Sequence, residues 1–518
     1  MSGQQHGTTV DPSKLAFETT TTRRKIIFSY WLIVLLAIPL WWKTTSIDRL
    51  SLPDSKVKTL RKKEWKFPVY LHLESHVTSH PIVEVQKSVE QFLTMDLQEE
   101  DGISVHVTAD NSTLGPGHYR IALEPGWTDP LVSDRSLSIG MHEETDDLSV
   151  DISRMRLSST LLKLLAPPSP LSSSTTHRVV KYSPIYRLAF TLLNEDASSG
   201  QASFSWEIEK AIKQYFEPVM DALSVLHNFT IESQVQMHAP LAFTPSTFDF
   251  ENQTIHCLTQ EDLTVFVNSA EWALSSSVSN DPVIHFILFV PSAERSPLRI
   301  LDHDGNPTSS NAFILPQWGG ITILNEPQQH LTLPSLTSTF FVFQEQLLSL
   351  LGLPSLPRSV RSNEVESLSK LFTDWQLDAL VRQRALENVK ESQQTLESIT
   401  ALVRQIENMP VGEDVKGDVQ GALNELELAH SMQDQSISTL YHSAQALKRS
   451  SRAFFNPGML ALLYFPAEHK YAVYTPLFAS VAAPLVAAVL REFAAWKKER
   501  KAKEAKESTE SEGNSKTK

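Results

Sequence analysis

The sequence predicts a membrane-anchored mixed α/β (α+β) lumenal domain with a long C-terminal helical hairpin, flanked by N- and C-terminal transmembrane helices. Two uncharged apolar runs, one near each end of the chain, predict the membrane helices. Between them, strand patterns alternate with helix patterns, which predicts packed layers of sheet and helix. A long stretch of helical periodicity just before the second apolar run predicts the hairpin.

Length and composition are consistent with this fold class and argue against a general nucleic-acid-binding protein or a fold held by disulfides. The chain has 518 residues, of which 41% are hydrophobic, enough to build more than one packed core. Its 46 basic and 60 acidic side chains give a net charge of −14, so the chain has no general attraction for nucleic acid. It contains one cysteine, Cys257, and therefore no intrachain disulfide.

The first apolar run, residues 26–42, follows a predicted cytosolic tail at 1–25. It contains no charged residue and is bounded by basic residues on both sides, with a length near the lower limit of the ~20 residues that cross a membrane. A cleaved signal peptide would need small residues at the end of the run. Trp41 and Trp42 stand there instead, and tryptophan suits the membrane interface, so we expect a retained anchor.

The second apolar run, residues 471–490, is also uncharged and lies between Lys470 and Arg491. Its two prolines are tolerated within membranes where neighbouring groups satisfy the freed carbonyls. A buried alanine-rich helix of a soluble core is the alternative, but the length and the charged flanks favour a transmembrane helix.

The tail at 491–518 sets the predicted orientation, because it is rich in lysine and arginine directly after the second run. Basic flanks remain in the cytosol, so we expect a cytosolic C-terminus. The flanks of the first run, counted alone, favour the opposite direction. Two spans place both termini on one side, however, so the stronger C-terminal signal predicts that residues 44–470 lie in the lumen or outside the cell.

Three N-glycosylation candidates fall within this exported stretch. They are Asn111 in "NST", Asn228 in "NFT" and Asn252 in "NQT". Ser and Thr are abundant here, so chance alone would give about as many sequons. The motifs are therefore consistent with the predicted orientation without adding weight to it.

Residues 43–366 form the predicted α/β region. Period-two alternation or short apolar runs predict strands at 69–76, 103–110, 118–126, 186–196, 229–238, 263–268, 283–291 and 319–325. Helical spacing predicts helices at 81–96 and 204–226, the second of them bent at Pro218. The order of the strands in the sheet does not follow from these patterns.

Apolar residues keep three-four spacing through residues 367–450, with an interruption near "NMPVGED" at 408–414. Two long antiparallel helices joined at this point would bury their stripes against each other or on the sheet domain. A stripe that binds a partner protein is the alternative. The aromatic-rich segment at 451–470 is expected at the membrane surface.

The residues themselves assign no catalytic, cofactor-binding or metal-binding site. Cys257 neighbours His256, but adjacent residues of an extended segment point to opposite faces, so we expect a buried, inert cysteine. Asp302 and Asp304 in "LDHDGNP" could hold a divalent metal against a sugar nucleotide, as in a lumenal glycosyltransferase. The same letters also predict a simple turn. The hydrolase pattern "GxSxG" and the phosphate-binding pattern "GxxxxGK" do not occur.

Three stretches carry a resemblance to a known family. "PLWWKTTSI" at 39–47, "WGGI" at 318–321 and "ALLYFPAEHKYAVYTPLF" at 461–478 together resemble the PIG-S family, in a fungal-like form. This family supplies a subunit of the glycosylphosphatidylinositol (GPI) transamidase complex. The residues that carry the motifs are Trp41, Trp42, Trp318, Gly319 and Gly320.

The resemblance implies a two-pass protein of the endoplasmic reticulum membrane, with both termini cytosolic and a large lumenal domain. It implies a non-catalytic subunit that supports assembly of the complex and attachment of GPI anchors to the C-terminus of precursor proteins, without a cofactor. The implied partners are the cysteine-protease-like catalytic subunit, the other subunits, precursor proteins and the GPI lipid, and no nucleic acid. A lumenal glycosyltransferase using Asp302 and Asp304, or a lumenal receptor for precursors, are the alternatives.

Overall fold

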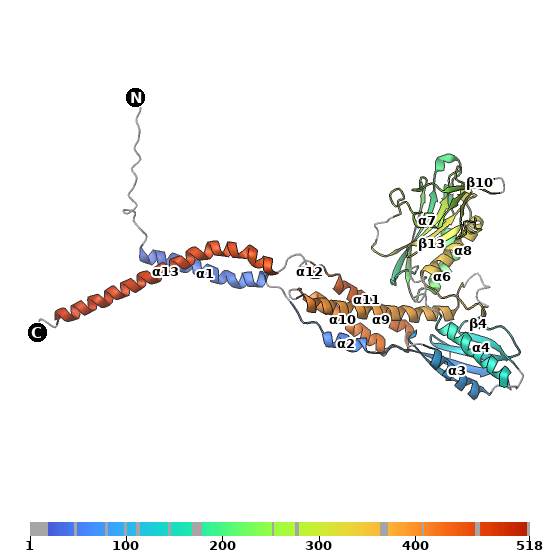
Figure 1. Cartoon of the computed structure of the whole chain (residues 1–518), viewed down its shortest axis with the longest axis horizontal. Helices are drawn as coiled ribbons and strands as arrows, with labels where there is room; N and C mark the ends of the chain where they lie inside the picture. The colour runs from blue at the N-terminus through green and yellow to red at the C-terminus, as the bar shows by residue number, and fades with distance from the viewer. Residues whose placement is uncertain are drawn as a thin grey trace, which may run out of the picture. The chain divides into compact units, whose positions relative to one another are not determined.

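The chain divides into two compact units in the computed structural model. The terminal unit comprises Met1–Leu52, Ile399–Gly417 and Arg452–Lys518, and the main unit comprises Pro53–Ser398 and Asp418–Ser451 (Figure 1). The structure describes residues 19–45, 49–77, 81–97, 101–109, 114–142, 147–167, 179–250, 253–274, 279–362, 371–406, 409–460 and 467–514.

The first sheet of the main unit has six strands in the order β16-β4-β5-β3-β1-β2. They are β1 (Phe67–Ser75), β2 (Ile103–Thr108), β3 (His118–Pro125), β4 (Leu131–Ser133), β5 (Ser136–Met141) and β16 (Arg361–Ser362). Strand β1 runs parallel to β2 and β3, and β3 runs parallel to β5. The predicted strands at 69–76, 103–110 and 118–126 are thus confirmed.

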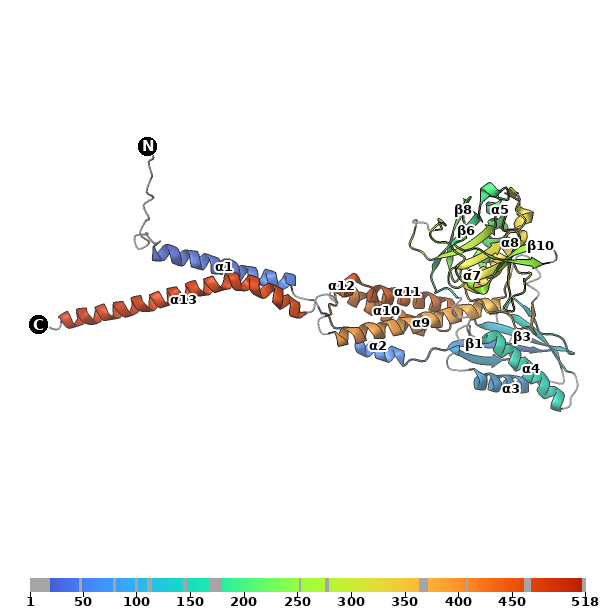
Figure 2. The ribbon, with the colours of Figure 1, turned by 45° about the horizontal axis from the view of Figure 1, so that its top comes forward.

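Two helices, α3 (Ile82–Asp96) and α4 (Asp147–Leu165), cover one face of this sheet (Figure 2). Apolar side chains of α3 at i, i+4 and i+8 meet those of β1, as the predicted helix at 81–96 requires. The buried apolar residues that these elements contribute to this core are Val69, Leu71, Leu73, Val85, Val89, Leu93, Leu157, Leu161, Leu164 and Leu165. Helix α4 was not predicted, because its apolar residues lie on two faces and leave Leu148 and Met155 exposed.

The second sheet has five strands in the order β13-β14-β11-β6-β8. They are β6 (Ile185–Asn194), β8 (Asn228–Gln236), β11 (Val283–Val290), β13 (Ala312–Leu315) and β14 (Gly319–Ile323). Four strands are parallel and β13 is antiparallel to β14. These pairings confirm the predicted strands at 186–196, 229–238, 283–291 and 319–325, in a sheet covered on both faces.

One face of the second sheet packs against α8 (Leu333–Leu350) and the helical segment at 208–222. An aromatic cluster fills this layer, made of Phe190, Phe216, Phe286, Phe340 and Phe343. The opposite face packs against a small sheet of β9 (Ser246–Phe250), β10 (Gln253–Leu258) and β12 (Leu298–Ile300). Strands β7 (Ser205–Trp206) and β15 (His330–Leu331) form a separate parallel pair.

The predicted helix at 204–226 is divided. It consists of α5 (Ile208–Ala211), the π-helical turn η6 (Ile212–Phe216) and α6 (Glu217–Ala222). Pro218 has no N–H group to donate to the preceding turn, so the irregular turn lies directly ahead of it. The side-chain amide of Gln344 on α8 donates to the carbonyl of Tyr215, a group within that turn.

The predicted strand at 263–268 is wrong. Residues Gln260–Thr264 form the short helix α7, followed by an irregular segment. Thr259 and Asp262 close a capping box at its start, and this local signal prevails over the apolar alternation that follows. Phe266 is fully buried there, which explains the apolar letters without a strand.

The predicted hairpin is three helices rather than two. Helix α9 (Asp374–Gln405) is followed by α10 (Glu413–Ser431) and α11 (Ser436–Phe454) (Figure 2). The predicted joint at 408–414 separates α9 from α10, but the second predicted helix is interrupted once more between α10 and α11. The hydroxyl of Thr439 donates to the carbonyl of Met432 across this second turn, at 2.7 Å. A short helix, α2 (Asp54–Arg61), lies along α9, where Gln393 donates to the Leu60 carbonyl.

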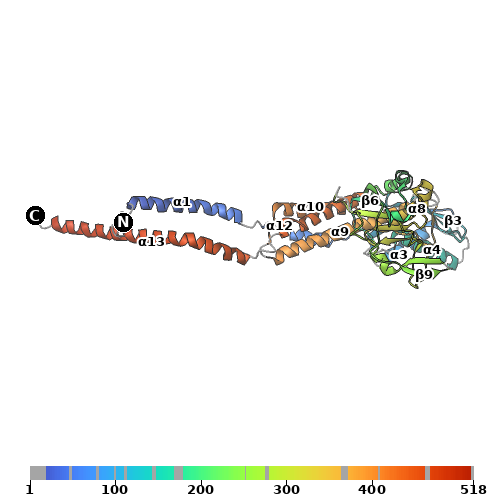
Figure 3. The ribbon, with the colours of Figure 1, turned by 90° about the horizontal axis from the view of Figure 1, so that it is seen from above.

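The terminal unit contains α1 (Thr20–Thr45), α12 (Pro457–Leu460) and α13 (Ala467–Asn514). Helices α1 and α13 lie side by side (Figure 3), and Arg24 near the start of α1 pairs with Glu492 of α13 at 3.0 Å. Large apolar side chains of both helices remain exposed, among them Phe28 at 69% and Leu490 at 64%. Among the described residues, one helical segment is long and apolar enough to cross a membrane, Phe478–Ala505, and it overlaps the predicted run at 471–490.

Candidate functional site

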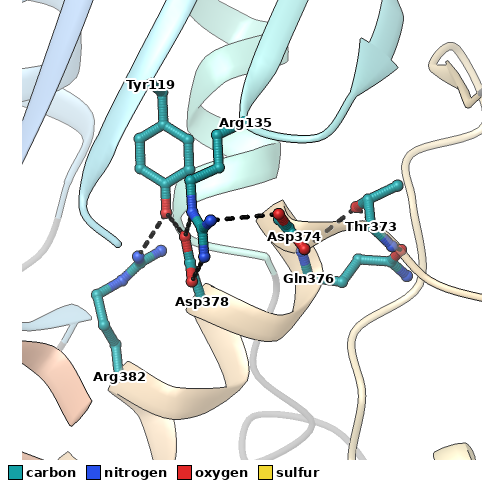
Figure 4. Close-up of polar contacts among 7 residues, drawn as sticks. All are labelled: Tyr119, Arg135, Thr373, Asp374, Gln376, Asp378 and Arg382. Atoms are coloured by element: carbon teal, nitrogen blue, oxygen red, sulfur yellow. Dashed lines mark hydrogen bonds and ion pairs between the residues drawn. The ribbon is translucent and has the colours of Figure 1, made fainter. Parts of the chain in front are cut away.

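The first turns of α9 form a junction of buried polar contacts in the main unit (Figure 4). Thr373 precedes the helix and forms a reciprocal cap with Gln376. The Thr373 N–H donates to the Gln376 side-chain oxygen at 2.9 Å, and the Gln376 N–H donates to the Thr373 hydroxyl at 3.4 Å. This Thr-x-x-Gln box fixes the start of the helix and so the direction of the side chains that follow.

An ion pair fastens α9 to the first sheet. Arg135, in the turn between β4 and β5, donates from Nε and Nη2 to the two carboxylate oxygens of Asp378, at 2.8 and 2.9 Å. Its Nη1 donates to Asp374 at 3.2 Å. Asp378 is 4% exposed, so this bidentate ion pair is shielded from solvent.

Tyr119 of β3 completes the network (Figure 4). Its hydroxyl donates to Asp378 at 2.9 Å and accepts from Arg382 at 3.0 Å. Burial raises the pKa of Tyr119, so the phenol keeps its proton and remains a donor. The ring stacks on Trp375 of α9, with centroids 4.1 Å apart. Aromatic stacking and hydrogen bonds to charged groups therefore both stabilise the contact between β3 and α9.

Two buried arginines extend the junction to other elements. Arg382 donates to the carbonyl of Leu165, at the end of α4, at 3.2 Å. Arg384 donates to the carbonyls of Leu351, just past α8, and Val180, at 2.8 and 3.1 Å. Cationic side chains at helix C-termini satisfy carbonyls that the helix leaves free. Helix α9 thereby joins the first sheet, α4 and the end of α8.

We interpret this junction as a structural contact that holds the elements together, and not as a catalytic site. Both carboxylates are paired with the Arg135 guanidinium group, and burial raises the pKa of Tyr119. These residues were not predicted from the sequence. Their signal is the spacing of Asp374, Asp378 and Arg382 at i, i+4 and i+8, which places three charges on one face of the helix.

The family motif at 318–320 is a packing motif. A Cβ on Gly319 would lie 2.1 Å from the carbonyl oxygen of His285, and one on Gly320 would lie 2.0 Å from the side-chain oxygen of Gln346. Trp318 stacks on His285 with centroids 4.5 Å apart, and burial lowers the pKa of His285 to about 4. The glycines allow β14 to approach β11 and α8 closely.

The pair Asp302 and Asp304 folds a turn. One carboxylate oxygen of Asp302 accepts the N–H groups of Asp304 and Asn306, at 2.9 and 2.8 Å. The bond from Asn306 holds the pKa of Asp302 below its usual value. Within the described ranges, no group of three or more His, Cys, Asp or Glu side chains is placed to hold a metal ion.

Cys257 lies on β10 and is fully buried beside Ile255 and Leu301. Burial raises the pKa of its thiol, which is the opposite of what a nucleophilic cysteine needs. Its neighbour His256 is on the same strand, where successive side chains point to opposite faces. The predicted burial of Cys257 is confirmed, and its inertness stays a prediction.

The structure describes some of the remaining candidate residues and not others. Asn228 is the exposed first residue of β8. Asn111 and Asn252 lie outside the described residues. Trp41 and Trp42 belong to α1, but their side-chain surroundings are outside what the structure describes.

Comparison with known proteins supports the resemblance found in the sequence. The family of phosphatidylinositol-glycan biosynthesis class S proteins matches residues 28–499. A GPI transamidase component PIG-S homolog of Schizosaccharomyces pombe is 30% identical, over 92% of this chain and 85% of that protein. The human GPI-anchor transamidase component PIGS is 28% identical over 93% and 98%. The Saccharomyces cerevisiae GPI transamidase component GPI17 is 26% identical over 86% and 87%. This chain belongs to the PIG-S family.

Proposed function

We propose that this chain is a subunit of the GPI transamidase complex, which joins GPI anchors to the C-terminus of precursor proteins. The observation that carries the proposal is the family match across residues 28–499, together with relatives named as components of that transamidase. The matched stretch includes the junction at the start of α9 and the family motif at 318–320. It therefore covers the contacts that hold the main unit together.

The role we assign is non-catalytic. The candidates for chemistry have structural explanations in the described part of the chain, since Cys257 is buried with a raised pKa and Asp302 accepts backbone N–H groups of its own turn. The alternative of a metal-dependent glycosyltransferase relied on Asp302 and Asp304 as metal ligands. The Asp302 carboxylate instead accepts N–H groups of its own turn, so this alternative is not favoured. A receptor that captures precursors alone is not favoured over membership of the complex. A main unit whose elements are joined through the first turns of α9 suits a subunit that supports assembly.

The location we propose is the membrane of the endoplasmic reticulum, with two spans and both termini cytosolic. Exposed apolar side chains along α1 and α13 need an apolar surrounding, which lipid or other membrane helices would supply. The pairing of Arg24 with Glu492 aligns the N-terminal end of the first apolar run with the C-terminal end of the second. The basic tail at 491–518 favours the cytosolic side.

The partners we propose are the cysteine-protease-like catalytic subunit and the other membrane subunits of the complex, extending to precursor proteins and the GPI lipid. This assignment rests on the family match and on relatives that are themselves components of the transamidase. The acidic chain adds no reason to expect nucleic acid.

The orientation predicts a glycan on Asn228. The residue is exposed at the start of β8, so a lumenal oligosaccharyltransferase could reach it. We expect Asn228→Gln to migrate faster than the wild type in gel electrophoresis, by the shift that the loss of one glycan produces. Treatment of both proteins with endoglycosidase should abolish this difference. The control is Asn228→Gln after enzyme treatment, which should comigrate with treated wild type. An unchanged mobility would argue against a lumenal, modified Asn228.

The non-catalytic role predicts that Cys257 is dispensable for chemistry. In cells depleted of the chain, precursor proteins should keep their C-terminal signal, and re-expression of wild type should restore GPI attachment. We expect Cys257→Ser and the better-packing Cys257→Ala to restore it to within about twofold, because a buried thiol contributes packing and little else. Loss of transamidation by both variants in a complex that still assembles would show that the sulfur takes part in the reaction.

A further inference from the structure

The segment that joins α9 to the first turn of α10 binds the chain just after α1. We call this segment, residues 409–414, the anchor loop. The Leu50 N–H donates to the Val411 carbonyl at 3.1 Å, and Arg49 forms a parallel β-bridge with Val411. The Arg49 guanidinium also donates to the carbonyl of Val403, near the end of α9, at 2.6 Å. Val411 is fully buried, so the anchor loop is packed within the terminal unit.

The anchor loop also binds the chain just before α13. The side-chain amide of Asn456 donates to the carboxylate of Asp414 at 2.6 Å. The side-chain oxygen of Asn456 accepts the N–H of Gly458, in α12, at 2.8 Å. Met459 of α12 is 2% exposed, so this segment is buried as well as hydrogen-bonded. One loop therefore contacts the connections to both terminal helices.

Only short segments separate these contacts from α1 and α13. Residues 46–48 lie between Thr45, the last residue of α1, and Arg49. Residues 461–466 lie between Leu460 and Ala467, the first residue of α13. An extended chain covers at most ~3.6 Å per residue, so these connections reach at most about 14 and 25 Å. The C-terminal end of α1 and the N-terminal end of α13 are therefore tethered to the same loop.

Charged side chains join the two helices a second time, near the N-terminal end of α1. Arg24 pairs with Glu492 at 3.0 Å and with Glu499 at 3.4 Å. Arg23 donates to the other carboxylate oxygen of Glu492. The side chain of Glu492 is 15% exposed, which limits screening of these ion pairs by solvent.

The two contact regions lie about one bilayer thickness apart along the helices. At 1.5 Å per residue, Arg24 lies ~32 Å along α1 from Thr45, and Glu492 lies ~38 Å along α13 from Ala467. The hydrocarbon core of a bilayer is ~30 Å thick. The anchor loop and the ion pairs are therefore spaced to hold α1 and α13 together on both sides of the membrane that we propose they cross.

We propose that α1 and α13 form one closed anchor pair in the assembled transamidase, with no helix of another subunit between them. The pairing rests on the contacts of this chain alone, and the identity of the surrounding assembly rests on the proposed function. The other subunits then contact the pair from outside, where apolar side chains such as Phe28 and Leu490 are exposed.

The first test links the two helices where Arg24 meets Glu492. The full-length chain carries Cys257→Ala with Arg24→Cys and Glu492→Cys, and replaces the native chain in cells. A short bismaleimide is added to isolated membranes, and the linked peptides are measured by mass spectrometry. We expect most of the chain to be crosslinked, to the same extent in membranes as after purification in detergent. Absence of the crosslink from membranes would overturn the proposal, whether or not it forms in detergent.

The matched control for this crosslink combines Arg24→Cys with Lys503→Cys in the same background. Lys503 lies on the same face of α13 as Glu492, about 16 Å further along the helix. We expect this control to crosslink at least tenfold less. Equal crosslinking of the two pairs would show that the reagent captures passing encounters, and would contradict a fixed pairing of α1 with α13.

The second test locks the other end of the pair and leaves Arg24 and Glu492 unchanged. Arg49→Cys and Val411→Cys, again with Cys257→Ala, replace two bridged residues whose Cα atoms lie within the range of a disulfide. We expect the disulfide to form under mild oxidation, and the locked chain to recover the same transamidase subunits as the wild type. Each single cysteine variant is a control, and the thermal midpoint of each purified chain reports folding.

Two results of the second test would overturn the proposal. One is a folded double variant that forms no disulfide, and the other is a locked chain that loses a subunit which both single variants recover. If the double variant does not fold, the crosslink in membranes decides the matter. The wild-type chain reports the proposed function separately, because its failure to recover any transamidase subunit counts against that function while the crosslink still measures the pairing.

Discussion

Replacing Asp378 with asparagine should destabilise the main unit by about 3–5 kcal/mol, the loss typical of removing one partner from a buried ion pair. Asparagine keeps the shape of the side chain but cannot balance Arg135, which donates to both oxygens of the carboxylate. The Tyr119 hydroxyl loses an anionic acceptor at the same time. Urea unfolding of the full-length chain in detergent, followed by tryptophan fluorescence, measures the change.

Two controls separate the buried charge from charge in general. Glu74 pairs with Arg120 at 3.2 Å on a half-exposed surface, and Glu74→Gln should change stability by less than about 1 kcal/mol. The double variant Arg135→Met with Asp378→Leu removes both charges and should be more stable than Asp378→Asn. If Asp378→Asn unfolds at the wild-type urea concentration, the junction does not fasten α9 to the sheet.

Gly319→Ala should destabilise the main unit by about 3 kcal/mol, at the upper end of what overpacking usually produces. The new methyl group would lie 2.1 Å from the backbone oxygen of His285, on the paired strand β11. A backbone atom in the middle of a sheet cannot move aside without breaking the pairing of β11 and β14. The shift in urea midpoint of the full-length variant gives the magnitude.

Gly417→Ala is the matched control, since it makes the same substitution in open space. Gly417 lies within α10, and a Cβ there meets nothing within 4 Å. Alanine is the better helix former, so this variant should be stabilised by up to about 1 kcal/mol. Equal effects of the two substitutions, in either direction, would contradict the packing explanation of the family motif.

The elements that the sequence predicts best are those whose pattern and environment agree. Strand β1 alternates because one of its faces meets α3 and α4. Strand β11 is apolar apart from His285, because helices and a second sheet cover its two faces. The prediction for residues 263–268 failed because Phe266 is buried in an irregular stretch, which produces the same letters as a strand.

The order of the strands and the α9 junction depend on contacts between distant residues. Arg135 and Asp378 lie 243 positions apart, and neither sits in a motif of its own. The spacing of Asp374, Asp378 and Arg382 marks a charged stripe on α9, but an exposed helix face shows the same pattern. Burial decides between the two, and burial follows from the fold. The glycines at 319 and 320 were found as a family mark, while their physical reason required the positions of His285 and Gln346.

The central claim is that this chain acts as a subunit of the GPI transamidase, and the set of proteins that accompanies it tests that claim most directly. The full-length chain would be tagged at the C-terminus, solubilised from membranes in mild detergent and purified, and the accompanying proteins identified by mass spectrometry. We expect a fixed group of membrane proteins in constant proportion that includes the cysteine-protease-like catalytic subunit. Purification of the intact, folded chain alone, or with a set of proteins that lacks this catalytic subunit, would contradict the claim.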